Sequence, residues 1–249
     1  MSSLMKGTAI LTIGLFLSKV LGLIYIFPFY AIVGEENIGL YQYAYIPYSI
    51  MLSLAISGIP LAVSKFVAKY NAVGDYETGR RLLRSSTKIM LLSGLLAFLF
   101  LYVMSTPIAH LVISDDEQIF TVKEVAEVIK WVSFALIVVP FMSLLRGFFQ
   151  GNGHYLPTSV SQLIEQIARI IILLSGSFIV VVLLDKDVKT AINFAVFAAF
   201  IGAIAGLMVL LHYWKKLKPT FNLNLQQGIS PAEKQPLSDI YKEILKYSI

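Results

Sequence analysis

The sequence predicts an all-α protein that crosses a membrane several times, and its composition and the placement of its charges are the observations behind that prediction. Of its 249 residues, 57% are hydrophobic and only 14% are charged, and the mean hydropathy is +0.76. Soluble domains carry about 25% charged residues. The charges here lie between apolar runs that exceed the ~20 residues needed to cross about 30 Å of hydrocarbon. A polytopic helical membrane protein follows.

We expect six membrane-spanning helices joined by short connections. Their predicted ranges are 7–33, 39–68, 87–113, 125–148, 157–184 and 190–214. The first run resembles a secretory signal peptide because Lys6 precedes it, but it is too long, is interrupted by Lys19 and lacks a small-residue cleavage site. We therefore interpret it as a retained first helix.

The second span begins with four tyrosines, at positions 41, 43, 45 and 48, which favour an aromatic belt at the outer membrane boundary. The alternative is that some of them line an outer mouth and hold sugars. Residues 70–84, before the third span, resemble a short amphipathic helix along the cytoplasmic face. Arg80, Arg81 and Arg84 in it would contact anionic headgroups, although topology alone also accounts for them.

Charge alternates along the connections. The turns at 34–37 and 114–117 are acidic and 185–189 is mixed, whereas 65–88 and the stretch after the sixth span are rich in Lys and Arg. Basic segments stay in the cytoplasm, so the N-terminus and both basic segments are predicted to be cytoplasmic.

The connection at 146–156 contains three glycines, which suit a tight reversal before Pro157 opens the fifth span. Its polar residues Arg146, Gln150 and Asn152 are candidates for a gate or for contacts to lipid headgroups. For Arg146 the alternative is a snorkelling anchor at the cytoplasmic interface.

After the sixth span, residues 215–238 are predicted to form a proline-containing cytoplasmic linker, and 239–249 to begin a further amphipathic helix. Six spans return the chain to the side where it started, so a second six-helix unit would enter in the same orientation. We therefore expect this chain to be the N-terminal lobe of a longer protein, with its own C-terminal lobe as a partner.

The fifth span carries a polar stripe. Gln162, Glu165, Gln166 and Arg169 follow at i, i+3, i+4 and i+7, so they share one helix face, and charges inside a membrane are expensive unless they face protein or water. Lys19 lies about 17 Å into the first span. Together these five residues are the candidate substrate site, a net cationic cavity suited to phosphate or pyrophosphate. The alternatives are a self-neutralised Glu165–Arg169 pair, a structural Lys19–Glu165 pair, and glutamines that satisfy nearby backbone rather than sugar hydroxyls.

Several classes of function find no support in the sequence. There is no cysteine and there are only three scattered histidines, so no metal site is predicted. No catalytic constellation, no nucleotide-binding loop and no nucleic-acid-binding motif is present, so we expect no enzyme activity, no cofactor and no nucleic-acid partner.

Four motifs together resemble the polysaccharide-flippase branch of the multidrug/oligosaccharidyl-lipid/polysaccharide superfamily. They are 18–22 (SKVLG), 39–45 (GLYQYAY), 58–65 (GIPLAVSK) and 146–151 (RGFFQG). Within that branch the sequence is most similar to the Gram-positive lipid II flippases of the MurJ-like, YtgP type and to the related stage V sporulation protein B. The resemblance covers all 249 residues.

The resemblance implies two six-helix lobes related by a pseudo-twofold axis. It also implies alternating-access flipping of a polyprenyl-pyrophosphate-linked saccharide, in peptidoglycan synthesis, across the bacterial plasma membrane. Lys19 stands where Gram-negative relatives have an arginine, whereas Tyr25, Ile26 and Ser53 fall near positions where those relatives have further charges. The Gram-negative charge pattern is therefore not reproduced, and the Glu165/Arg169 pair is the candidate replacement.

Three functions compete at this point. The leading hypothesis is a flippase for a lipid-linked oligosaccharide, with lipid II first, that works among membrane lipids. The others are a transporter for another envelope polysaccharide or a cation-coupled drug exporter of the same superfamily, and a non-transporting scaffold for envelope synthesis. An exporter of cations would need an acidic, aromatic cavity, whereas in a scaffold the intramembrane polar residues would be purely structural.

Overall fold

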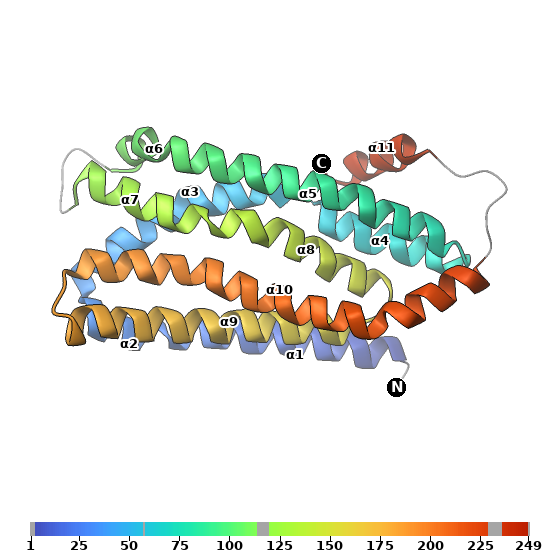
Figure 1. The fold of residues 1–249 in the computed structure, drawn as a ribbon, viewed down its shortest axis with the longest axis horizontal. Coiled ribbons are helices and arrows are strands. Elements are labelled where there is room, and N and C mark those ends of the chain that lie inside the picture. The colour runs from blue at the N-terminus through green and yellow to red at the C-terminus, as the bar shows by residue number, and fades with distance from the viewer. Residues whose placement is uncertain (1–2, 57, 114–119, 229–235, 249) are drawn as a thin grey trace.

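The computed structural model describes residues 3–56, 58–113, 120–228 and 236–248, and within these ranges every regular element is helical. Long helices run nearly side by side in an elongated bundle (Figure 1). Six continuous or interrupted helices are long and apolar enough to cross a membrane. They cover Gly7–Val33, Glu35–Ala72, Tyr76–Val103, Val122–Gly151, Tyr155–Leu183 and Val188–Gln227.

Three of these spans consist of two helices each. The first is α1 (Ser3–Ile24) and α2 (Ile26–Val33), the second is α3 (Ile38–Ile56) and α4 (Ile59–Ala72), and the fourth is α7 (Val122–Ser133) and α8 (Ala135–Gly151). Between α3 and α4, Gly58 has a positive φ of 71° and Pro60 opens the new helix. Gly147 of α8 packs against the carbonyl of Pro60, so α8 lies directly beside this break.

The remaining spans are α5 (Tyr76–Val103), α9 (Tyr155–Phe178) with the π-helical turn Ile179–Leu183, and α10 (Val188–Gln227). A short α6 (Ser105–Val112) follows α5, and η1 (Glu35–Asn37) joins α2 to α3. The tight reversal predicted within 146–156 is present and narrows to residues 152–154, with Gly153 at a φ of +74°. It makes α8 and α9 an antiparallel hairpin.

The connections gather at two opposite ends of the bundle (Figure 1). The acidic turn at 34–37 and the turn at 184–187 lie at one end, whereas the N-terminus and the connections at 73–75 and 152–154 lie at the other. This is the alternation that the charge pattern indicates. The predicted acidic turn at 114–117 lies outside the described residues.

Three sequence predictions differ from the structure. The third span, predicted to reach residue 113, ends at Val103, and the separate α6 follows it. The separate surface helix at 70–84 is wrong, because residues from Tyr76 onward are the first turns of α5, continuous with the third span and capped by Asp75. The sixth helix also continues past residue 214 to Gln227 with Pro219 inside it, so the first part of the predicted linker is helical. Proline removes one backbone bond but does not end a helix whose neighbours supply other contacts.

The last helix, α11 (Leu237–Ser248), packs on the ends of α4 and α5. Ile240 is buried, and the hydroxyl of Tyr241 forms hydrogen bonds with Ser85 Oγ (2.8 Å) and Ser86 Oγ (2.9 Å). The amphipathic character predicted for this segment therefore corresponds to a docked helix.

Candidate functional site

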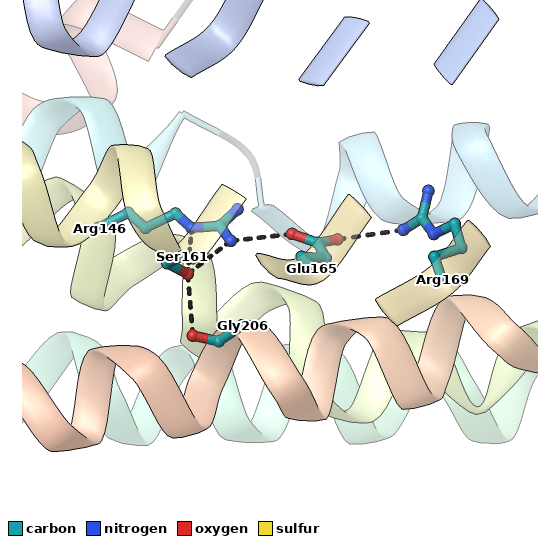
Figure 2. Close-up of polar contacts among 5 residues, drawn as sticks. All are labelled: Arg146, Ser161, Glu165, Arg169 and Gly206. Carbon is teal, nitrogen blue, oxygen red and sulfur yellow. Dashed lines mark hydrogen bonds and ion pairs between the residues drawn. The ribbon is translucent and has the colours of Figure 1, made fainter. Parts of the chain in front are cut away.

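Three charged side chains form a row in the middle of the bundle, and two helices provide them. Glu165 of α9 lies between Arg146 of α8 and Arg169, one turn further along α9 (Figure 2). Arg146 Nη2 is 2.8 Å from Glu165 Oε2, and Arg169 Nη2 is 3.0 Å from Glu165 Oε1. Each carboxylate oxygen thus serves a different guanidinium, and the row has a net charge of +1.

The row is largely shielded from solvent. The side chains of Arg146, Glu165 and Arg169 are 12%, 14% and 21% exposed. Ion pairs at this degree of burial are strong only when hydrogen bonds satisfy their remaining donors and acceptors. The two arginines differ in that respect.

Arg146 is anchored by a second partner. Its Nε (3.2 Å) and Nη2 (2.7 Å) both donate to Ser161 Oγ, and that hydroxyl donates to the Gly206 carbonyl of α10 (2.9 Å) (Figure 2). Three helices therefore fix this guanidinium. Arg169 is held only through Glu165 in the described structure, and its Nε is buried with no hydrogen-bond partner among the described residues.

Two glycines of α10 leave the space that the side chains of the charged row occupy. A β-carbon added at Gly202 would lie 2.8 Å from the Glu165 carbonyl oxygen, and one at Gly206 would lie 3.2 Å from Arg146 Nη2. The Gly202/Gly206 pair in the sequence is the small-residue spacing that allows close helix contact. Here that contact brings the α10 backbone directly against the charged row.

Three tyrosines of α3 lie near the Arg169 end of the charged row. Tyr41, Tyr45 and Tyr48 lie within electrostatic range of the Arg169 guanidinium. Tyr41 packs on Phe29 and Tyr45, Tyr48 is buried, and Tyr45 Oη is buried without a partner among the described residues. The belt interpretation is therefore wrong for Tyr48, whose ring is buried, and stays a prediction for Tyr41 and Tyr45, which are half-buried.

The other predicted site residues lie on α1 and α9. Lys19 is exposed on α1, and Glu165 pairs with two arginines rather than with Lys19, so the structural Lys19–Glu165 pair is wrong. Gln166 Nε2 faces Gly22 of α1, where a β-carbon would lie 3.2 Å away. Gln162 Oε1 is buried and has no partner in the described part of the chain.

The predicted gate residues separate into two groups. The Arg146 guanidinium belongs to the buried row rather than to the turn. Asn152 lies in the turn after α8, where its Oδ1 accepts a hydrogen bond from Asn71 Nδ2 at 2.9 Å. Gln150 is half-buried near the same turn.

The sequence contains a signal that Arg146 belongs to the charged row. In an antiparallel hairpin, residues equally distant from the turn face each other, and Arg146 and Ser161 lie seven and eight residues from Gly153. A long arginine side chain at that position reaches one helical turn further, to Glu165. The spacing of the polar stripe within α9 does not reveal the contact between Arg146 and Glu165, because that contact crosses the hairpin.

Comparison with known proteins gives consistent matches over nearly the whole chain. Residues 4–230 match the family described as polysaccharide biosynthesis protein. The chain is 42% identical over 248 residues to lipid II flippase MurJ of Bacillus subtilis (strain 168), covering 99% of this chain and 45% of that protein. It is 26% identical over 232 residues to stage V sporulation protein B of the same organism, covering 90% and 42%. The chain thus spans less than half the length of these curated relatives.

Solved structures show the same fold at low sequence identity. One is a transporter of the MOP superfamily from Pyrococcus furiosus Vc1 (DSM3638), with a TM-score of 0.67 and 15% identity over 98% of this chain and 51% of that one. Another is an outward-facing multidrug resistance transporter of the MATE family, with a TM-score of 0.67 and 15% identity over 97% and 50%. Likeness at this level concerns the arrangement of the helices only.

Proposed function

Because the chain belongs to the polysaccharide biosynthesis protein family of multi-pass membrane proteins, we propose that it is the N-terminal lobe of a flippase. Its substrate is a polyprenyl-pyrophosphate-linked cell-wall saccharide, lipid II, which it carries from the inner to the outer leaflet of a bacterial plasma membrane by alternating access. The N-terminus faces the cytoplasm, and a C-terminal lobe provides the other wall of the substrate cavity.

The observation that supports this proposal is the buried row of two guanidiniums and one carboxylate. A pyrophosphate inside the membrane needs cations in a low-dielectric setting, and arginine binds phosphate oxygens with two parallel hydrogen bonds. The row offers a net charge of +1 on helices that are themselves apolar. A cationic drug would meet repulsion there, which disfavours the exporter alternative.

The remaining candidate residues have supporting roles in the proposal. Lys19, exposed on α1, is the further cation that meets the pyrophosphate, and Gln162 and Gln166 donate to saccharide hydroxyls. Gln150 and Asn152, near the connection between α8 and α9, contact the headgroup as it enters from the cytoplasmic leaflet.

The test uses the full-length protein in its own host. Depletion is expected to lower the amount of labelled lipid II that an impermeant reagent reaches in the outer leaflet. If that amount is unchanged, the flippase proposal is wrong, and normal flipping with impaired wall synthesis would support a scaffold instead.

Variants localise the activity to the row. Arg169→Lys keeps the charge but loses the planar fork, so flipping should fall at least tenfold at normal membrane levels, and Lys19→Ala should also impair it. Arg84→Lys, at an exposed position of α5, is the matched control and should behave as wild type. Full activity of both Arg169→Lys and Lys19→Ala would remove the site from the proposal.

A further inference from the structure

The carboxylate of Glu165 lies between two guanidiniums. It bridges two guanidiniums, with one oxygen at 2.8 Å from Arg146 and the other at 3.0 Å from Arg169. A phosphate group with several oxygens bridges two arginines in the same way. If the row binds pyrophosphate, as the proposed function requires, then both of its best donors are already engaged by an anion of the protein itself.

The two arginines would respond differently to the loss of Glu165. Arg146 keeps its two hydrogen bonds to Ser161, and Ser161 is itself fixed to the Gly206 carbonyl. Arg169 would keep no hydrogen bond that the described structure shows, and its Nε is already an unused buried donor. One guanidinium is therefore pre-positioned, whereas the other is free to turn toward an incoming ligand.

Among the residues that the structure describes, no second carboxylate pairs with Arg146 or Arg169. The α10 surface against the row is formed by Gly202 and Gly206, and the α3 side provides the hydroxyls of Tyr45 and Tyr48. Without Glu165, two guanidiniums would be buried beside each other with no counter-charge from the described residues. Uncompensated buried charges are strongly destabilising, so the empty site needs Glu165 and the occupied site does not.

We propose that Glu165 is an internal anion that holds Arg146 and Arg169 in the empty site and is exchanged for the diphosphate group of a polyprenyl-linked substrate. This rests on the proposed function and assigns Glu165 a role in it. The carboxylate lowers the affinity for the diphosphate because the ligand must displace it. It also speeds release, because it rebinds the guanidiniums as the diphosphate leaves.

The test measures the binding of undecaprenyl diphosphate to the purified full-length protein in lipid nanodiscs. Glu165→Gln keeps the size and shape of the side chain but removes the competing charge, so its Kd should be about tenfold lower than that of wild type, while single-turnover release becomes slower. Glu124→Gln is the matched control. It removes a carboxylate that pairs with Lys189 at the end of the bundle where α7 and α10 begin, and should leave the Kd unchanged.

A second variant keeps the proposal testable if Glu165→Gln does not fold. Glu165→Asp keeps the charge but is one methylene too short to bridge both guanidiniums, so it should bind the probe more tightly than wild type, by a smaller factor. If neither variant binds more tightly, the exchange is wrong. Inorganic diphosphate is a second probe, which shows whether the diphosphate group alone displaces Glu165. If Glu165→Gln binds the lipid more tightly than wild type but not the inorganic ion, the exchange at the charged group is wrong.

Failure of the proposed function gives a different result. Arg146→Lys and Arg169→Lys should each weaken binding of undecaprenyl diphosphate at least tenfold. If both bind it as wild type does, the row is not the diphosphate site and the proposed site fails. If they weaken binding but the Glu165 variants do not strengthen it, only the exchange fails.

Discussion

At the level of single residues, Ser161 is the least conspicuous member of the charged row and the one that organises it. It accepts from two nitrogens of Arg146 and donates to the backbone of α10, so one hydroxyl links three helices. Small hydroxyl side chains commonly join membrane helices in this way. The position of Arg146 depends on this residue as much as on Glu165.

Ser161→Ala should therefore displace Arg146. We expect a loss of about 1–3 kcal/mol of stability, because a buried guanidinium loses its acceptor, together with weaker binding of undecaprenyl diphosphate. Thermal unfolding in detergent and a binding titration measure the two effects. Ser159→Ala is the control: Ser159 is also buried but bonds to the carbonyl of Ile10 at 3.2 Å. It should lower stability alone, and equal loss of binding in both variants would contradict the role given to Ser161.

Part of this site could be predicted from the sequence and part could not. Glu165 and Arg169 lie on one helix, so their spacing alone places them together, and the structure confirms their pairing at 3.0 Å. Arg146 belongs to another helix, and its partner depends on how the hairpin closes. The exposed position of Lys19 depends on how α1 packs on α9, which a pattern within one helix does not contain.

At the level of elements, the contact between α9 and α10 depends on glycines that differ in how much space they leave. A β-carbon at Gly202 would lie 2.8 Å from a backbone oxygen of α9, whereas one at Gly176 would lie 3.7 Å from Phe194 Cβ, an ordinary contact. Both glycines lie in the same helix pair. They therefore form a matched pair of sites.

Gly202→Ala should push α10 away from α9 and destabilise the protein by about 1–3 kcal/mol, as overpacking does. It should also reduce diphosphate binding, because the backbone of α10 at Gly206 positions Ser161. Gly176→Ala should be tolerated. Thermal unfolding of the two variants compares them directly, and equal stability would show that α9 and α10 separate easily.

The start of α10 depends on pH. Asp187 caps the helix by accepting from the Thr190 amide at 2.8 Å, and the hydrogen bonds to Thr190 hold the pKa of Asp187 below its ordinary value. A carboxyl group with a lowered pKa stabilises the fold above its unfolded-state pKa of about 3.9, and this contribution is lost as the pH falls through the lower folded-state pKa.

Asp187→Ala should therefore loosen the first turn of α10 at neutral pH by about 1 kcal/mol, the usual value of an N-cap. Hydrogen exchange at the Thr190 amide, corrected for intrinsic rates, should be faster in the variant at pH 7 and equal to wild type once the pH is below the pKa of Asp187. Lys186→Ala, one residue earlier, is the control. A difference that persists at low pH would mean that the carboxylate is not the cap.

The element predictions were most accurate where apolar runs were long and least accurate at their ends. Residues 76–84 are polar enough to be a surface helix, yet they continue α5 because Asp75 caps it and Leu82 and Leu83 are buried. Hydropathy measures how far a helix is apolar, whereas capping and packing determine where it begins. The same applies to α10, which continues through Pro219.

At the level of the whole molecule, the six spans and their alternating ends could be predicted from hydropathy and charge, since both follow from the thickness of the bilayer and the positive-inside rule. The breaks inside spans one, two and four could not, because they depend on contacts such as Gly147 against Pro60. The overall fold is therefore much more predictable than the path of each helix through the membrane.

The orientation in the membrane can be tested directly, because the 249 residues contain no cysteine. In a full-length protein without other cysteines, Glu36→Cys and Lys186→Cys should react with an impermeant maleimide on intact cells. Arg84→Cys and Lys218→Cys should react only after permeabilisation. The opposite pattern would invert the proposed orientation, and with it the leaflet from which the substrate enters.

The charged row also makes the proposed transport cycle sensitive to voltage. Empty, the row and Lys19 together carry +2; a diphosphate diester of about two negative charges neutralises them. An elementary charge that crosses the whole membrane changes its energy by about 2.3 kcal/mol per 100 mV. With a negative cytoplasm, the empty site is driven inward, whereas the loaded site crosses without electrical work. An ordinary resting potential would therefore favour the return of the empty site, without a coupling ion bound in this lobe.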